Sequence, residues 1–287
     1  MKRIVTIQDI SCIGRCSLTV ALPILSSMGV EACVLPTAVL SGHTAFPSFS
    51  FHDLTEEIPK ISAVWEQQKL CFDAIYSGYL GSVRQIRMML DFYTRFGEQG
   101  VLKIADPAMA DAGKLYQGFD DKFAQAMKEL CGKADIIVPN LTEGCILSGT
   151  PWREDTDAAF CEEIAAKLGT LGAGRVVLTG FSTGKDNIGA LAYDSATGES
   201  FCCLNERYPV SFHGTGDIFA SVLSGALTRG MAYRDAVQLA VDFDHDCIGK
   251  TLEDPDHRWY GVNFEQALPG LIRRMQDTVI LKSVEKV

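Results

Sequence analysis

The chain has 287 residues, of which 47% are hydrophobic and 22% charged, a composition typical of folded globular proteins. Its formal net charge of −10 excludes bulk electrostatic affinity for nucleic acid or an anionic membrane, because both require a basic face. The sequence shows no long apolar run, no signal-peptide pattern at its start and no C-x-x-C pair among its ten cysteines. We therefore expect a reduced cytoplasmic protein that binds neither nucleic acid nor membrane.

Short β-branched runs alternate with longer amphipathic stretches along most of the chain. The expected strands are residues 3–7, 32–39, 74–77, 102–105, 136–138 and 176–178. The expected helices between them are residues 18–28, 54–69, 83–96, 120–131 and 156–168. This alternation predicts an α/β fold whose mostly parallel central sheet is covered by helices on both faces.

The last third of the chain has a different pattern. Expected strands at residues 188–193 and 200–204 flank a turn signal and predict a β-hairpin. Expected helices then follow at residues 218–229, 233–249 and 264–275 without clear strands between them. Since no linker or repeat divides the chain, we predict a single domain over residues 1–287, built as a three-layer sandwich with a helical C-terminal part.

The strongest local motif is Gly214-Thr215-Gly216-Asp217, directly before a helical pattern. Two glycines allow the backbone to approach a ligand, and the free N–H groups of a helix start favour an anion such as phosphate. Asp217 lies at the same helix start and could accept a proton from an attacking hydroxyl group. The alternative is that Asp217 only caps the helix, since Asp is a preferred N-cap residue.

Several better-known sequence motifs are absent or lack the structural context that they require. Residues 249–251 end like a P-loop but lie inside a helical pattern, and no G-x-G-x-x-G occurs. Residues 180–184 match the G-x-S-x-G nucleophile elbow, but no helix follows them. The five histidines never pair at zinc-ligand spacing.

A magnesium site is compatible with the sequence, because Mg²⁺ needs only one or two carboxylates besides substrate phosphates. Asp106, Asp111 and Glu143 each come just past an expected strand, and ligands of open α/β sheets bind at the carboxyl ends of strands. The alternative for each is a solvated loop carboxylate.

Taken together, segments in order from about residue 4 to residue 252 resemble the ribokinase-like superfamily, and within it the vitamin B6 (pyridoxal) kinases. The segments are Ile7-Gln8-Asp9, Ser41-Gly42-His43-Thr44, Ser77-Gly78-Tyr79, DPAMAD at 106–111, DIIVPNLTE at 135–143 and GTGD at 214–217. Each segment alone is weak evidence, whereas six in order at compatible spacing are specific.

The resemblance implies a kinase that uses ATP and Mg²⁺ to phosphorylate the 5′-hydroxymethyl group of pyridoxal, pyridoxamine or pyridoxine. Asp217 would be the general base, and the backbone of Gly214, Thr215 and Gly216 would stabilise the transferring phosphoryl group. The resemblance also implies a homodimer and leaves open a monovalent cation such as K⁺.

The remaining site residues follow from the same resemblance. The implied ATP-binding residues are Asp111, Asn140, Thr179, Gly180 and Thr215. The implied Mg²⁺ site comprises Glu143, Asn140 and Asp106, partly through water. The implied vitamer-binding residues are Asp9, Thr44 and Tyr79. Residues 204–212 would form a loop that shields the phosphates.

Two positions depart from the pattern of the B6 kinases. Asp9 stands where the family usually has a serine, and Gly42 replaces an asparagine. A carboxylate at position 9 would favour a protonated group on the substrate, so we expect pyridoxamine to be a good substrate. The alternatives are that Asp9 has no effect, that the chain is a hydroxymethylpyrimidine kinase, or that it binds B6 without catalysis.

Overall fold

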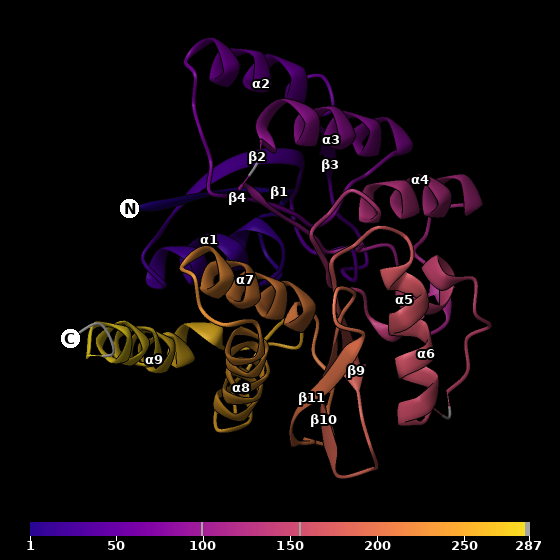
Figure 1. The fold of residues 1–287 in the computed structure, drawn as a ribbon, viewed down its shortest axis with the longest axis vertical. Coiled ribbons are helices and arrows are strands. Elements are labelled where there is room, and N and C mark those ends of the chain that lie inside the picture. The colour runs from indigo at the N-terminus through magenta and orange to yellow at the C-terminus, as the bar shows by residue number, and fades with distance from the viewer. Residues whose placement is uncertain (99, 155, 285–287) are drawn as a thin grey trace.

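The computed structural model describes residues 1–98, 100–154 and 156–284. The strands of its main sheet are Lys2–Ser11 (β1), Val30–Leu40 (β2), Phe51–Asp53 (β3), Ala74–Ser77 (β4), Leu102–Ala105 (β5), Ile136–Ile137 (β8), Arg175–Phe181 (β9), Asn187–Asp194 (β10) and Glu199–Glu206 (β11). Within the described residues the sheet has nine strands in the order β11-β10-β9-β8-β5-β4-β1-β2-β3 (Figure 1). Ala110–Asp111 (β6) and Lys114–Leu115 (β7) form a separate small hairpin.

The strands from β9 to β2 in this order are parallel, which confirms the mostly parallel sheet expected from the sequence. The predicted hairpin is also present, because β10 pairs antiparallel with both β9 and β11. At the opposite edge the short β3 pairs antiparallel with β2. The carboxyl ends of these parallel strands therefore lie along one edge of the sheet, which is where ligands of open α/β sheets bind.

Helices cover both faces of this sheet (Figure 1). They are Leu18–Ser27 (α1), Ile58–Gln67 (α2), Val83–Phe96 (α3), Asp121–Cys131 (α4), Leu141–Ser148 (α5), Ala158–Gly169 (α6), Thr215–Thr228 (α7), Tyr233–Leu252 (α8) and Phe264–Val284 (α9). One hydrophobic core lies between the sheet and α1, α7, α8 and α9, and a second lies between the sheet and α2 to α6. Two cores on opposite faces confirm the three-layer α/β fold.

Four elements were not expected from the sequence: β3, β6, β7 and α5. Helix α2 begins at Ile58 and not at residue 54, because Asp53 accepts a hydrogen bond from the Thr55 N–H at 2.6 Å and the chain turns there. Helix α7 begins three residues earlier than its apolar pattern, at Thr215.

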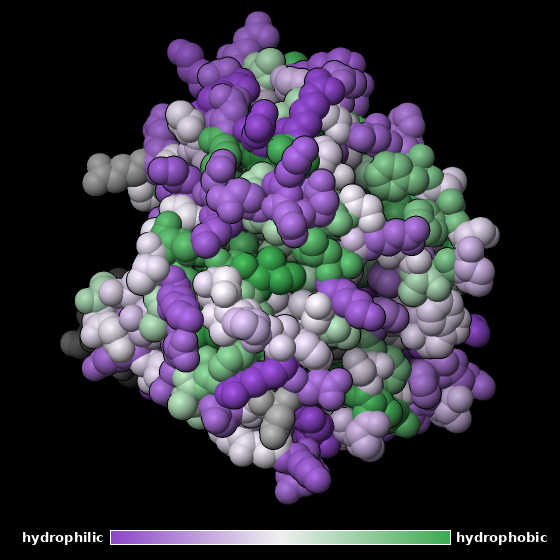
Figure 2. Space-filling view, turned by 90° about the vertical axis from the view of Figure 1, so that its right-hand side faces the viewer, coloured by the Kyte–Doolittle hydropathy of each residue, from purple (hydrophilic) through white to green (hydrophobic). Residues whose placement is uncertain are grey.

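The surface is mixed in character. Figure 2 shows that hydrophilic side chains predominate at the top of the face turned to the viewer, whereas hydrophobic side chains gather in a band across its middle. No helix in the described part of the chain is long and apolar enough to span a membrane.

Candidate functional site

The candidate site is built along the carboxyl ends of neighbouring parallel strands. Backbone hydrogen bonds continue past the strand ends: Asp106 N–H donates to Ser77 O at 2.8 Å, and Thr179 N–H donates to Pro139 O at 2.9 Å. An isolated bridge also pairs Asn140 with Thr179. These contacts hold Asp106, Asn140 and Thr179 in fixed order along the edge of the sheet.

A cavity of about 800 Å³ lies over this edge. Its lining includes every residue that the sequence suggested for the anion hole, the base, ATP and Mg²⁺: Asp106, Asp111, Asn140, Glu143, Thr179, Gly180, Gly214, Thr215, Gly216 and Asp217. Residues from segments more than 100 positions apart therefore meet at one place, as expected for a binding site.

The N-terminus of α7 opens into this cavity. Gly214 is its N-cap residue, with φ of 85°, and no side chain caps the helix. A Cβ atom at Gly214 would lie 2.2 Å from the carbonyl oxygen of Arg15, so the turn requires glycine. A Cβ atom at Gly216 would meet nothing within 4 Å. The first N–H groups of α7 thus remain available for an anion.

Asp217 does not cap this helix, so the capping interpretation is wrong: it is the third residue of α7. Its carboxylate instead accepts a hydrogen bond from the backbone N–H of Ser17. Burial raises the pKa of Asp217 to about 6, an effect that the Ser17 hydrogen bond opposes and the nearby Asp9 carboxylate reinforces. A carboxylate with such a pKa is a suitable general base near neutral pH.

Asp106 and Glu143 place two further carboxyl groups in the same cavity. Burial, together with the charges of Glu143 and Asp217, raises the pKa of Asp106 well above its usual range. Burial raises the pKa of Glu143 to about 7, although hydrogen bonds from three backbone N–H groups oppose the shift. A bound divalent cation would relieve the repulsion between the carboxylates of Asp106, Glu143 and Asp217.

Asn140 and Glu143 have a structural role that the sequence analysis missed. They form a capping box at the start of α5. Glu143 also accepts hydrogen bonds from the N–H groups of Met109 at 2.9 Å and Ala110 at 3.3 Å, and Asn140 Nδ2 donates to Ala110 O at 2.8 Å. Both side chains therefore hold the loop that follows Asp106.

The donor set is compatible with Mg²⁺ in the form that the sequence suggested. Among the described residues no group of three or more His, Cys, Asp and Glu side chains converges as a ready ligand set. Asp106 accepts a backbone hydrogen bond from Ala108, whereas Asn140 and Glu143 are each engaged with several backbone groups. Asp106 is therefore the better candidate for direct coordination, and Asn140 and Glu143 suit contact through water.

The three predicted vitamer-binding residues lie outside the lining of the cavity. Thr44 is exposed in the loop between β2 and β3, and its neighbour His43 lines the cavity. Asp9 is buried, and burial raises its pKa against hydrogen bonds from Ser17 and Ser11. The charge of Asp9 raises the pKa of both Tyr79 and Asp217, so its carboxyl group lies near the predicted ring-binding residue and near the base.

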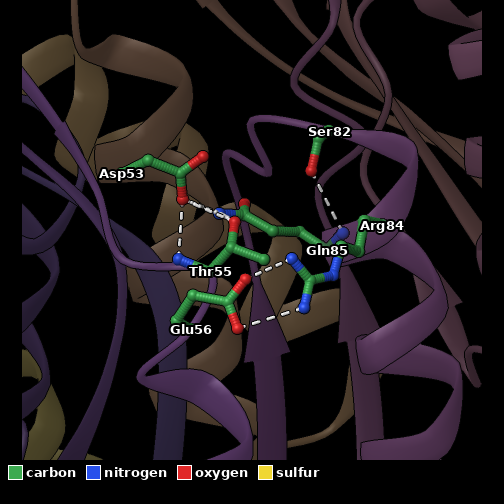
Figure 3. A network of polar contacts seen from close by, with 6 residues as sticks. All are labelled: Asp53, Thr55, Glu56, Ser82, Arg84 and Gln85. Atoms are coloured by element: carbon green, nitrogen blue, oxygen red, sulfur yellow. Dashed lines mark hydrogen bonds and ion pairs between the residues drawn. The ribbon is translucent and has the colours of Figure 1, made fainter.

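A buried glutamine, Gln85, bonds to Thr55 and Asp53 (Figure 3), and it also fixes the loop that carries Tyr79. Gln85 Oε1 accepts from Gly81 N–H at 2.7 Å, and Gln85 Nε2 donates to Thr37 O at 3.0 Å and to Thr55 Oγ1 at 2.9 Å. Thr37 Oγ1 in turn donates to the carbonyl oxygen of Tyr79 at 3.1 Å. The network therefore ties the Tyr79 loop to β2 and to the start of α2.

Another wall of the cavity consists of α8 and of residues 207–212, which follow β11. The α8 part of this wall was not expected from the sequence, whereas residues 207–212 lie within the expected loop at residues 204–212. Tyr208 of this segment stacks on His245 of α8 with ring centroids 4.7 Å apart. The shielding loop expected at residues 204–212 is shorter than predicted, because β11 continues to Glu206.

The motifs rejected from the sequence have ordinary structural roles. Residues 249–251 lie inside α8, and the segment after Ser182 leads into β10 and not into a helix. Neither a P-loop nor a nucleophile elbow is therefore present at these positions.

Similarity to known proteins agrees with this geometry. Residues 22–258 match the phosphomethylpyrimidine kinase family. The chain belongs to this family. A Bacteroides thetaiotaomicron structure assigned as a phosphomethylpyrimidine kinase is 40% identical, covers 94% of this chain and 93% of its own, and has a TM-score of 0.91.

Two pyridoxal kinases are also similar to this family member. The structure of pyridoxal kinase from Lactobacillus plantarum is 31% identical, covers 95% of this chain and 97% of its own, and has a TM-score of 0.87. Pyridoxal kinase of Arabidopsis thaliana is 24% identical over 284 residues, which is 96% of this chain and 90% of that protein. The resemblance to B6 kinases of the ribokinase-like superfamily, and the enzyme class that it implied, are thereby confirmed.

Proposed function

We propose that this protein is an ATP- and Mg²⁺-dependent kinase that phosphorylates the 5′-hydroxymethyl group of a vitamin B6 vitamer. The observation that carries the proposal is the position of Asp217, a carboxyl group of raised pKa beside the uncapped start of α7 and in one cavity with Asp106. Similar proteins support the acceptor: a 38% identical structure from Bacteroides thetaiotaomicron contains pyridoxal, and a 27% identical protein of Bordetella avium is named a pyridoxine/pyridoxal/pyridoxamine kinase.

In the proposed reaction Asp217 takes the proton of the substrate hydroxyl group. The hydroxyl oxygen then forms a bond to the γ-phosphorus of ATP, while the bond from this phosphorus to the bridging oxygen breaks and ADP leaves. The Ser17 N–H holds the Asp217 carboxylate in place throughout. Positioning and charge stabilisation, and not a covalent intermediate, supply the rate enhancement.

The charge that develops on the transferring group is stabilised by the N–H groups at the start of α7, where Gly214, Thr215 and Gly216 leave the backbone open. Mg²⁺ would supply positive charge that neutralises the phosphates, and Asp106, Asn140 and Glu143 would hold it, partly through water. Residues 207–212 line the same cavity, and in the proposed reaction they would shield the phosphates from water.

The second candidate is a hydroxymethylpyrimidine kinase with the same catalytic residues. Two observations favour it: the description of the matching family, and a Bacillus subtilis hydroxymethylpyrimidine/phosphomethylpyrimidine kinase that is 28% identical over 206 residues. Both substrates carry a hydroxymethyl group on a flat heteroaromatic ring, so the residues around this ring decide between them.

The deciding experiment measures ADP formation with ATP, Mg²⁺ and four acceptors: pyridoxal, pyridoxamine, pyridoxine and hydroxymethylpyrimidine. We expect the highest kcat/KM with a B6 vitamer. We also expect Asp217→Asn to lower kcat by a factor of about 10² to 10⁴ while nucleotide binding is retained. Turnover of hydroxymethylpyrimidine alone establishes the second candidate, and absence of ADP formation with every acceptor indicates a binding protein.

The proposal includes a homodimer, which the resemblance implies, and a cytoplasmic location, which is expected from the sequence. Light scattering of the purified protein tests the assembly, and a mass of one chain at micromolar concentration would contradict it.

A further inference from the structure

One face of α8 forms a wall of the cavity. Val241, Asp244, His245 and Ile248 all line it, and their spacing of three, four and seven residues places them on the same side of the helix. Phe219 of α7 adds an aromatic ring to this wall. The wall is thus apolar apart from two polar side chains.

The rest of the cavity suits the charged part of a nucleotide. The start of α7 offers N–H groups to phosphate, and Asp106 suits the metal that accompanies phosphate. The apolar side chains of the α8 wall form no hydrogen bonds with phosphate. We therefore expect this wall to contact the base of the nucleotide, which is flat and uncharged.

Asp244 has unused hydrogen-bonding capacity on this wall. Its Oδ1 is shielded from solvent and has no hydrogen-bond partner among the described residues, and the same holds for Nε2 of His245. Buried polar atoms without partners are rare and costly in folded proteins, so they call for an explanation such as a ligand. Here the cavity that Asp244 lines supplies the place for that ligand.

A hydrogen-bond donor on the ligand would satisfy this oxygen of Asp244. Burial alone raises the pKa of Asp244 well above the usual range of a carboxyl group, and no other charge contributes to the shift. A carboxyl group keeps at least one acceptor oxygen whether or not it is protonated. Adenine presents such a donor, its exocyclic 6-amino group, whereas hypoxanthine and guanine carry an acceptor oxygen at this position.

We propose that Asp244 is a specificity-determining residue of the phosphoryl-donor site, where its carboxyl oxygen accepts a hydrogen bond from the 6-amino group of adenine. This inference rests on the proposed function, because it takes the cavity to hold the nucleotide. His245 supports the same wall: its ring, stacked on Tyr208, joins residues 207–212 to α8 and closes the cavity beside the base.

The test uses calorimetric titration with the β,γ-imido analogues of ATP and ITP in the presence of Mg²⁺. We expect the wild-type protein to bind the ATP analogue at least about tenfold more tightly than the ITP analogue. Asp244→Leu should abolish the preference by weakening binding of the ATP analogue. Asp244→Asn should reduce it, because the asparagine amide can accept from a 6-amino group or donate to a 6-oxo group. Asp246→Asn is the matched control on the same helix, since Asp246 pairs with Arg274 outside the cavity lining.

Equal binding of the two analogues by the wild-type protein, or an unchanged preference in Asp244→Leu, overturns the proposal. The wild-type comparison decides the question even if Asp244→Leu fails to fold. Vitamer turnover without preference for the ATP analogue overturns this inference and leaves the proposed function intact. If the protein prefers the ATP analogue but turns over no vitamer, the role of Asp244 in recognising adenine is supported and the proposed function is overturned.

Discussion

Asn140 and Glu143 hold each other at the first turn of α5: Asn140 Oδ1 accepts from Glu143 N–H at 2.9 Å, and Glu143 Oε2 accepts from Asn140 N–H at 2.9 Å. The same glutamate bonds the backbone beyond Asp106. One side chain therefore fixes the relative positions of two strand ends that both line the cavity.

This arrangement predicts a large stability effect at Glu143. Glu143→Ala leaves several N–H groups without their acceptor, so we expect the free energy of unfolding in urea to fall by about 2–3 kcal/mol. Glu143→Gln retains one acceptor oxygen, so its free energy of unfolding should fall by less than that of Glu143→Ala. Glu163→Ala, at an exposed glutamate paired with Lys167, is the control and should change stability by less than about 1 kcal/mol. Equal stability of the two alanine variants would contradict the structural role.

The raised pKa of Asp217 predicts a distinctive pH–rate profile. A general base acts only when ionised, and the pKa of this carboxyl is raised by burial to about 6. We expect kcat/KM, corrected for ionisation of the vitamer, to rise about tenfold per unit below pH 6 and to level off above about pH 7. A profile that is flat between pH 5 and pH 7 would show that the base has an ordinary carboxyl pKa.

The same shift predicts that Asp217→Asn stabilises the protein. Since the folded pKa of about 6 exceeds the usual value of 3.8, the folded chain binds the proton more tightly than the unfolded chain. Stability contributed by this group is therefore present at low pH and is lost between about pH 4 and pH 6. We expect the free energy of unfolding of Asp217→Asn, measured in urea, to exceed that of the wild type by roughly 1–3 kcal/mol at pH 8. At pH 4.5 the difference should be much smaller. Asp246→Asn should show no such pH-dependent gain.

Asp9 is expected to select among the vitamers. Its buried carboxyl lies near Tyr79 and Asp217, so an ionised Asp9 would stabilise the protonated amine of pyridoxamine. We expect Asp9→Ser and Asp9→Asn to lower the ratio of kcat/KM for pyridoxamine over pyridoxal by about tenfold. If neither variant changes this ratio, Asp9 is only a structural partner of Ser11 and Ser17.

Gln85 is expected to act on substrate binding through the Tyr79 loop. Gln85→Leu removes four hydrogen bonds from buried or partly buried groups, so we expect a loss of about 2–3 kcal/mol in the free energy of unfolding. Because the loop carries Tyr79, KM for the vitamer should rise more than kcat falls, with KM for ATP unchanged. The control is Gln67→Leu at an exposed position of α2. A fall in kcat alone would argue against the positioning role.

The fold and the strand-end residues could be predicted because both depend on local pattern. Alternating elements imply a parallel sheet, and a parallel sheet places Asp106, Asn140 and Thr179 along one edge. Helix α5 was missed although Asn140 and Glu143 carry the spacing of a capping box, since both were interpreted as metal ligands and Asn140 also as an ATP-binding residue. The eight-residue helix has little amphipathic pattern of its own to reveal it.

Other parts of the site depend on contacts between distant segments. The α8 wall is an example, because the face of α8 that meets the cavity is decided by packing against α7 and not by local sequence. Tyr208 and His245 stack across 37 positions, and no local pattern in either segment indicates this pairing. Asp244, the residue with the clearest unused capacity for a ligand, could be found only once this wall was in place.

The two glycines at the start of α7 are constrained by different parts of the molecule. Gly214 is fixed from within, by its backbone angle and by the Arg15 carbonyl oxygen behind it, whereas Gly216 has open space on the side where a Cβ atom would stand. A side chain at Gly214 would therefore disturb the fold, whereas one at Gly216, which lines the cavity, would disturb only what fills it. In lineages that keep this architecture but abandon phosphoryl transfer, Gly214 should persist while Gly216 drifts, so the pair separates inherited shape from inherited chemistry.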